Sequence, residues 1–227
     1  MQIGHIGGIG DFGKFALLRY LRQNRRLAVC WYLTDASNGM EDYGKHFDYL
    51  KQPDKFRHLA PELYDQLVDF AYDRRGIIDP LMALQSSGVL ENAVFVGQEV
   101  PKRASMRPFW AKELASLVGG ANLVFLDPGA GIQGKRLTKR HVALSEIAAL
   151  RQNDRALVIS HLQSGRKAEV KYLADRMKSL GCNSVEIVRL RLVKSCFYVI
   201  LDQDTEMAEL AATFVRKWGN LAKSYRF

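Results

Sequence analysis

Six short apolar runs, rich in β-branched and aromatic residues, recur along the chain and predict strands. They cover residues 27–33, 93–96, 122–127, 156–161, 185–190 and 197–201. Apolar residues at consecutive rather than alternate positions are typical of strands buried on both faces of a parallel sheet. Between these runs, apolar residues recur with a helical period, which predicts helices over residues 14–23, 61–73, 107–117, 138–150, 164–180 and 205–218. The alternation predicts one α/β domain with a mostly parallel sheet.

The helix ends carry residues that favour capping. Thr138, Ser164 and Thr205 stand where a side-chain oxygen can accept from the first free amide groups of a helix. Gly181 follows the helix predicted over 164–180, and we expect it to end that helix.

The last two predicted strands break the alternation. Only about six residues separate 185–190 from 197–201, too few for a crossover helix, so these strands are expected to be antiparallel neighbours. A doubly wound, mostly parallel sheet that ends in an antiparallel hairpin and a closing helix is an order of elements typical of class I methyltransferases. The polar segment at about 34–60 interrupts this order and is interpreted as a long loop or small insertion in a single domain spanning residues 1–227.

Composition narrows the class of protein. The 227 residues are 48% hydrophobic and 25% charged, which excludes intrinsic disorder and a disulfide scaffold. Three cysteines without metal-ligand spacing, no apolar run long enough to cross a membrane and no visible signal peptide lead us to expect a reduced, cytoplasmic protein without a membrane partner. The net charge of +9 favours polyanionic partners.

Candidate chemistry follows three predicted strands, because ligands of open α/β sheets bind beyond the carboxyl ends of the strands. Asp127 is the most informative residue, since it ends an apolar strand and is followed at once by Pro128 and a glycine-rich turn. We interpret it as a carboxylate aimed into a cleft, the alternative being an Asp-Pro turn that merely closes the strand. His161 ends another strand and is a catalytic candidate, as a base or a metal ligand, with a satisfied surface residue as the alternative. Thr34, Asp35 and Gly39 follow the first strand as candidate cofactor contacts.

The N-terminal segment is also rich in glycine. Gly10, Asp11 and Lys14 precede or open the first predicted helix, where a helix N-terminus favours anions. The spacing fits neither a P-loop nor a dinucleotide fingerprint, and a capped first helix is the alternative. The pairs His46–Asp48 and Asp54–His58 match no standard zinc pattern, so solvated loop residues are the favoured interpretation.

Basic residues are concentrated rather than spread evenly. Lys135, Arg136, Lys139 and Arg140 follow the Asp127 turn directly, and we expect them to contact the phosphates of DNA or RNA. A solvated helix face is the alternative. A second group, Lys102, Arg103 and Arg107, precedes a helix that contains the aromatic residues Phe109 and Trp110, which can either stack on bases or belong to the core.

In this order of elements, the chain resembles the large-subunit ribosomal RNA adenine methyltransferases. The segment 10–14, read Gly-Asp-Phe-Gly-Lys, looks like a variant of the motif that opens their first helix, and 127–130, read Asp-Pro-Gly-Ala, resembles their catalytic Asp-Pro-Pro-Tyr. The resemblance implies a class I fold, S-adenosylmethionine as cofactor, and a target amine held by Asp127 and the Pro128 carbonyl. Two departures stand out: no aromatic residue occupies position 130, and the cofactor strand is followed by one glycine.

Three functions remain open on the sequence. The leading one is methylation of a nucleic-acid base by S-adenosylmethionine, with Gly10, Asp11, Lys14 and the 34–39 segment at the cofactor. The second is a metal-dependent nuclease or phosphodiesterase, in which Asp11, Asp127 and His161 hold a divalent cation. The third is a non-catalytic nucleic-acid-binding subunit that keeps the fold.

Overall fold

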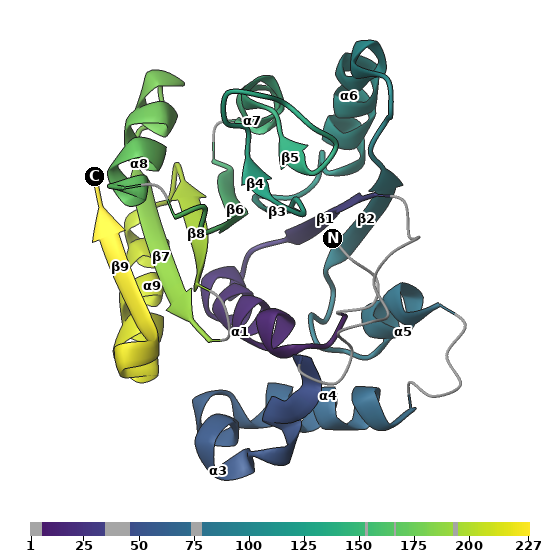
Figure 1. Cartoon of the computed structure of the whole chain (residues 1–227), viewed down its shortest axis with the longest axis vertical. Helices are drawn as coiled ribbons and strands as arrows, with labels where there is room; N and C mark the ends of the chain where they lie inside the picture. Colours follow the sequence, from purple (N-terminus) through teal and green to yellow (C-terminus); the bar gives the residue numbers. More distant parts are fainter. Residues whose placement is uncertain (1–5, 35–45, 74–78, 153, 166, 193–194) are drawn as a thin grey trace.

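The computed structural model describes residues 6–34, 46–73, 79–152, 154–165, 167–192 and 195–227, and its centre is a seven-stranded sheet (Figure 1). The strand order is β2-β1-β3-β6-β8-β7-β9. The strands are β1 (Leu27–Leu33), β2 (Val94–Glu99), β3 (Leu123–Asp127), β6 (Ala156–Leu162), β7 (Val185–Arg191), β8 (Ser195–Leu201) and β9 (Ala222–Arg226). The short strands β4 (Gly131–Ile132) and β5 (His141–Val142) pair with each other in a separate parallel ladder.

The direction of the strands divides the sheet into two parts. Strand β1 pairs in parallel with β2 and β3, and β3 pairs in parallel with β6. Strand β8 is antiparallel to both β6 and β7, and β9 is antiparallel to β7. The predicted α/β class and C-terminal hairpin are therefore confirmed, and the arrangement is a class I methyltransferase-like topology.

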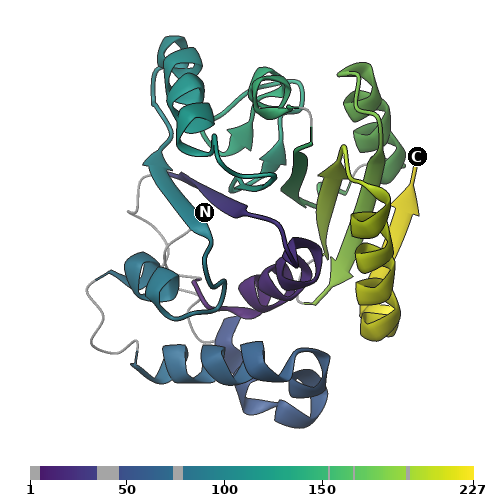
Figure 2. The ribbon, with the colours of Figure 1, turned by 180° about the vertical axis from the view of Figure 1, so that it is seen from behind.

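Helices cover both faces of the sheet, as Figures 1 and 2 show from opposite sides. One face packs against α1 (Ile9–Arg22), α4 (Pro61–Asp73), α5 (Pro80–Ser86) and α9 (Thr205–Trp218), and the other against α6 (Arg107–Leu117), α7 (Leu144–Leu150) and α8 (Glu169–Ser179). Strand β3 is buried along its whole length, and β6 is buried except at its last residue, because both faces are covered.

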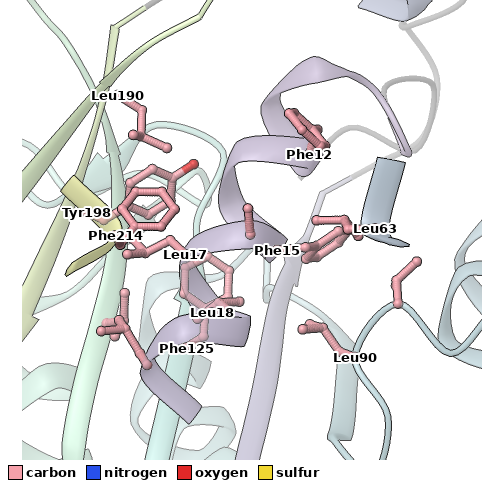
Figure 3. Close-up of a cluster of buried hydrophobic side chains, with 14 of the residues drawn as sticks. Phe12, Phe15, Leu17, Leu18, Leu63, Leu90, Phe125, Leu190, Tyr198 and Phe214 are labelled. Carbon is pink, nitrogen blue, oxygen red and sulfur yellow. The ribbon is translucent and has the colours of Figure 1, made fainter. Parts of the chain in front are cut away.

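Helix α1 lies in the middle of the larger core. Phe12, Phe15, Leu17 and Leu18 are each at most 1% exposed, and Figure 3 shows them between the sheet residues and Leu63 of α4. A helix that is apolar on most sides is stable only when it is buried. Gly13 allows this close packing, because a Cβ there would lie 2.6 Å from a methyl group of Leu192.

Helix α1 begins earlier than predicted. It starts at Ile9 instead of residue 14, with the amides of Asp11 and Phe12 donating to the carbonyl of Gly8. Gly10, Asp11 and Lys14 therefore lie in the helix itself rather than in a flexible segment before it.

Two predicted helix starts are wrong. Residues 138–142 form a turn and strand β5, and α7 begins only at Leu144, because the Glu146 carboxylate accepts from the amide of Ala143 and fixes the start there. Ser164 does not cap α8, which begins at Glu169. The amide and the hydroxyl of Ser164 instead donate to the Glu169 carboxylate.

The other helix ends are closer to the prediction. Helix α9 begins at Thr205, but the capping carboxylate belongs to Asp204, which accepts from the amide of Met207 at 2.7 Å. Gly181 follows α8 with a φ of 75°, in the left-handed region that glycine adopts most readily.

Several short elements were not predicted. The segment expected to be a loop contains α3 (Pro53–Phe56) between two 3-10 turns, Asp48–Lys51 and Arg57–Leu59. Helix α5 and strand β9 were also missed, because each is short and its apolar pattern is weak. No helix within the described ranges has the length and apolar character needed to cross a membrane.

Candidate functional site

The N-terminus of α1 meets the carboxyl end of β3. Asp127 is the last residue of β3 and pairs in register with Trp31 of β1. The chain passes from β1 outward to β2 and then returns to β3 on the other side of β1, so the boundary between β1 and β3 is a topological switch point. In open α/β sheets this is the place where ligands bind.

Lys14 joins two carboxylates at this point. Its Nζ lies 2.7 Å from Oδ1 of Asp11 and 2.7 Å from Oδ2 of Asp127. The Ser160 hydroxyl, from the adjacent strand β6, donates to Oδ1 of Asp127 at 2.8 Å. All four residues are buried, with 6–7% of their surface exposed. We call Asp11, Lys14, Asp127 and Ser160 the Asp–Lys–Asp cluster.

The segment before α1 supports the cluster. The amide of Gly7 donates to Oδ2 of Asp11 at 2.9 Å, and the Tyr49 hydroxyl donates to the carbonyl of Gly7 at 2.9 Å. Tyr49 belongs to the polar insertion, and its ring packs against Phe12. The insertion therefore helps to hold the first turn of α1 in place.

The charges of the cluster reinforce one another. Burial by itself would lower the pKa of Lys14, but the neighbouring Asp11 and Asp127 carboxylates raise it above its usual value. Burial would likewise raise the pKa of Asp127, but the Lys14 ammonium and the Ser160 hydroxyl bring it below its usual value. Asp127 is therefore an ionised hydrogen-bond acceptor at neutral pH, and the cluster has two carboxylates for one ammonium.

His161 is separated from this cluster. Successive residues of a strand face opposite sides of the sheet, and Ser160 is the residue that faces Asp127. The His161 Nδ1 accepts from the amide of Ile132 at 2.9 Å, so its proton lies on Nε2, 3.3 Å from Oε1 of Glu169. Burial lowers the pKa of His161, although Glu169 opposes this, so the ring is neutral at pH 7.

Gly131 fits against this histidine. Its φ is 114°, and a Cβ there would lie 2.3 Å from Nδ1 of His161. The glycine of the turn therefore makes room for the His161 ring. The alternative of a metal site built from Asp11, Asp127 and His161 does not match this geometry, because the histidine does not join the two carboxylates and Lys14 lies between them.

The remaining predicted residues are dispersed. Gly10 is exposed in the first turn of α1, Thr34 is half-buried just after β1, and Pro128 is buried after Asp127. Asp35 and Gly39 lie outside the described residues. His58 is exposed, Asp48 pairs with Lys51, and no three His, Cys, Asp or Glu side chains in the described ranges are placed to hold one metal ion.

The basic loop between β4 and β5 is anchored beside Asp127. Lys135, Arg136 and Arg140 are exposed and Lys139 is half-buried. The Arg140 guanidinium donates to the carbonyl of Gly129 at 3.2 Å, and the Arg140 carbonyl accepts from the amide of Ala130 at 2.8 Å. Arg140 therefore ties the basic loop to the Asp127 turn, and the four basic residues predicted to bind nucleic acid lie in a loop instead of a helix.

Sequence reasoning missed a buried ion pair next to this loop. Arg107 is 6% exposed, and its guanidinium binds both oxygens of Glu146 at 2.6 and 2.7 Å. Tyr32 also donates to Glu146, at 3.2 Å. In the sequence, Arg107 stands with Lys102 and Arg103 in a basic group before a helix, and nothing next to it indicates that a glutamate 39 residues away buries it.

A polar cavity of about 850 Å³ lies on the opposite side of the sheet, where the amino ends of the parallel strands meet; we call this the amino edge. Four of the charged side chains that line the cavity pair with each other: Arg25 binds Asp204 at 2.8 Å, and Arg151 binds Asp202. The buried cysteines are equally unsuited to chemistry, because burial raises the pKa of Cys30 to about 12 and that of Cys182 to about 11. Neither feature adds a candidate site.

No protein-family model matches the sequence, and comparison with curated proteins gives no match either. The geometry of the structure is therefore the main guide to function. It shows an α/β fold with a mixed seven-stranded sheet that is parallel at its core, a class I methyltransferase-like topology, and a buried cluster of charges at the topological switch point.

Proposed function

We propose that the protein is an S-adenosylmethionine-dependent methyltransferase that acts on a base of DNA or RNA, like the ribosomal RNA adenine methyltransferases that its sequence resembles. One observation carries the proposal. In a class I methyltransferase-like topology, an ionised Asp127 ends the strand at the switch point and is bound to the N-terminal turns of α1.

The charge of the cluster suits this cofactor. Two carboxylates around one ammonium leave a net negative charge, which complements the sulfonium and amino groups of S-adenosylmethionine. The first turn of α1, where Gly10 is exposed, offers amide groups that favour an anion such as the cofactor's carboxylate. When bound, S-adenosylmethionine supplies an electrophilic methyl group.

Asp127 is suited to hold the target amine. Each carboxylate oxygen accepts one hydrogen bond within the cluster, and each has a second lone pair for another donor. The lowered pKa keeps Asp127 ionised, so that it accepts from an exocyclic N–H instead of donating to it. The carbonyl of Pro128 is the proposed second acceptor. A base in a duplex has to leave its stack to reach this position.

Transfer of labelled methyl groups from S-adenosylmethionine to purified RNA and DNA tests the proposal. We expect Asp127→Asn, which keeps the side-chain size but removes the charge, to lower transfer at least a hundredfold. Asp204→Asn, at the amino edge of the sheet, is the matched control and should leave transfer unchanged. Equal transfer by the wild type and Asp127→Asn would contradict the role of Asp127.

The two other functions make different predictions in the same experiment. A metal-dependent nuclease would cleave the substrate only with magnesium or manganese; the geometry favours it less, because the Lys14 ammonium lies between the carboxylates that would have to bind the metal. A non-catalytic binding subunit would bind nucleic acid without transfer, and its binding would survive Asp127→Asn.

A further inference from the structure

Among the segments of the chain that lack acidic residues, two are basic and are joined in the fold by Arg107. Residues 100–112 and residues 128–145 each contain four basic residues and no Asp or Glu. For a protein with 24 acidic residues in 227, two such segments represent a local concentration of positive charge.

The fold brings the two segments together. Arg107, at the start of α6, donates to the carbonyl of His141 at 2.8 Å, just beyond the basic loop. The same guanidinium binds Glu146 at the start of α7, so α6, the loop and α7 are held as one unit. Figures 1 and 2 both show the loop between β4 and β5 beside α6.

Exposed apolar side chains accompany these charges. Phe109 is 70% exposed, Met106 48% and Leu137 38%. The adjacent Trp110 is buried, and its ring packs against Tyr32 at a centroid distance of 5.0 Å. The structure thus separates two aromatic residues that the sequence could not distinguish, because only Phe109 is available to a ligand.

We propose that these segments form a docking surface for a single-stranded stretch of nucleic acid, next to the Asp127 turn. Its phosphates bind the exposed cations, and an unpaired base stacks on Phe109. The surface consists of Lys102, Arg103, Phe109, Lys135, Arg136 and Arg140. This inference rests on nucleic acid being the substrate class of the proposed function, and it adds the strand state and the binding residues.

The combination of charges and an aromatic ring selects this partner. A duplex presents phosphates but keeps its bases stacked on each other, so no base of the duplex is free to stack on the Phe109 ring. An acidic protein would satisfy the cations but would not specifically need an aromatic ring. Arg140 also contacts the carbonyl of Gly129, so the docking surface is continuous with the turn that follows Asp127.

Fluorescence anisotropy with labelled single-stranded and duplex RNA and DNA of equal length, without S-adenosylmethionine, tests this surface. We expect single strands to bind more tightly than duplexes. Phe109→Ala should weaken single-strand binding about fivefold to a hundredfold, as the loss of one base–aromatic stack does. Tyr72→Ala, at a side chain that is 84% exposed on α4, is the matched control and should have no effect.

The charge is tested separately. Lys135→Glu with Arg136→Glu should reduce the slope of log affinity against log salt concentration by about 1.4, as expected for two lost phosphate contacts. Lys178→Glu with Lys217→Glu changes the net charge equally at exposed positions elsewhere and should leave the slope unchanged.

Three outcomes would overturn the docking surface: no nucleic-acid binding at low salt, equal binding by the Phe109→Ala variant and the wild type, or duplex binding as tight as single-strand binding. Failure of the methyltransferase proposal looks different, because single strands would then bind through Phe109 and Lys135 while no methyl group is transferred.

Discussion

Two buried cations lie at opposite ends of the parallel strands, one at the amino edge and one at the carboxyl edge, and they are stabilised in different ways. At the amino edge, Arg155 is 3% exposed and donates to four backbone carbonyls, those of Val118, Gly119, Ala121 and Leu150, at 2.9–3.2 Å. At the carboxyl edge, Lys14 is 7% exposed and binds two carboxylates.

The difference distinguishes a cation that the structure alone explains from one that belongs to the proposed cofactor site. Arg155 satisfies carbonyls at the ends of α6 and α7, which helices leave without partners, and it needs no ligand to explain it. Lys14 faces one carboxylate more than its charge requires. Because a buried ion pair is usually no more stabilising than apolar side chains of similar volume, the buried group of three charges supports the proposed cofactor site.

The largest expected effect on stability is at Lys14. Lys14→Met leaves Asp11 and Asp127 as buried carboxylates without a cation, and we expect it to lower the free energy of unfolding by about 3–5 kcal/mol. Urea denaturation measures this. Adding Asp11→Asn to the variant should restore part of the loss, and a loss below about 1 kcal/mol would show that the cluster is not electrostatically coupled.

Arg155→Met tests the other edge and should have a smaller effect. It leaves neutral carbonyls rather than charges without a partner, so we expect the free energy of unfolding to fall by about 2–3 kcal/mol. The binding of S-adenosylmethionine by the folded variant should equal that of the wild type. Weaker binding of S-adenosylmethionine by Arg155→Met would contradict the view that Arg155 is structural while Lys14 belongs to the cofactor site.

The smallest effect is the pH dependence from His161. Its pKa is lowered in the folded protein, so the unfolded chain binds a proton more readily, and stability falls as pH drops below the ordinary value of 6.5. The pKa of Asp127 is also lowered, but protonation of the unfolded state there costs stability only below about pH 4.

Denaturation midpoints between pH 7.5 and 5 check this prediction. His161→Gln should flatten the decline relative to the wild type, while the exposed His58→Gln should not. His141, whose pKa is lowered by burial and by nearby Arg140, contributes in the same direction, so some decline should remain in His161→Gln. An unchanged slope would mean that His161 titrates as it does in the unfolded chain.

The sequence predicted what is local and missed what depends on distant partners. The apolar runs located the main strands along the chain, and the short connection before β8 indicated the antiparallel hairpin. Asp127 could be recognised because a charged residue directly after a buried strand has few structural explanations. Its partner Lys14, 113 residues away, was recognised only as a separate candidate.

The failures have the same cause. Ser164 is a residue type that often caps helices, but its hydroxyl donates to the Glu169 carboxylate instead. Arginine is usually exposed, but Arg107 is buried because it pairs with Glu146. His161 ends the correct strand yet faces away from Asp127, because the alternation of a strand places it opposite Ser160. None of these pairings can be predicted from the pattern around a single residue.

Calorimetric titration with S-adenosylmethionine tests the central claim most directly, namely that the Asp–Lys–Asp cluster is a cofactor site. The wild type and Asp204→Asn are predicted to bind equally, and Asp11→Asn, which removes one of the two carboxylates while leaving Lys14 paired with Asp127, should bind at least tenfold more weakly, a loss of about 1.4 kcal/mol. Absence of binding by the wild type at millimolar cofactor, or equal binding by Asp11→Asn, would contradict the claim.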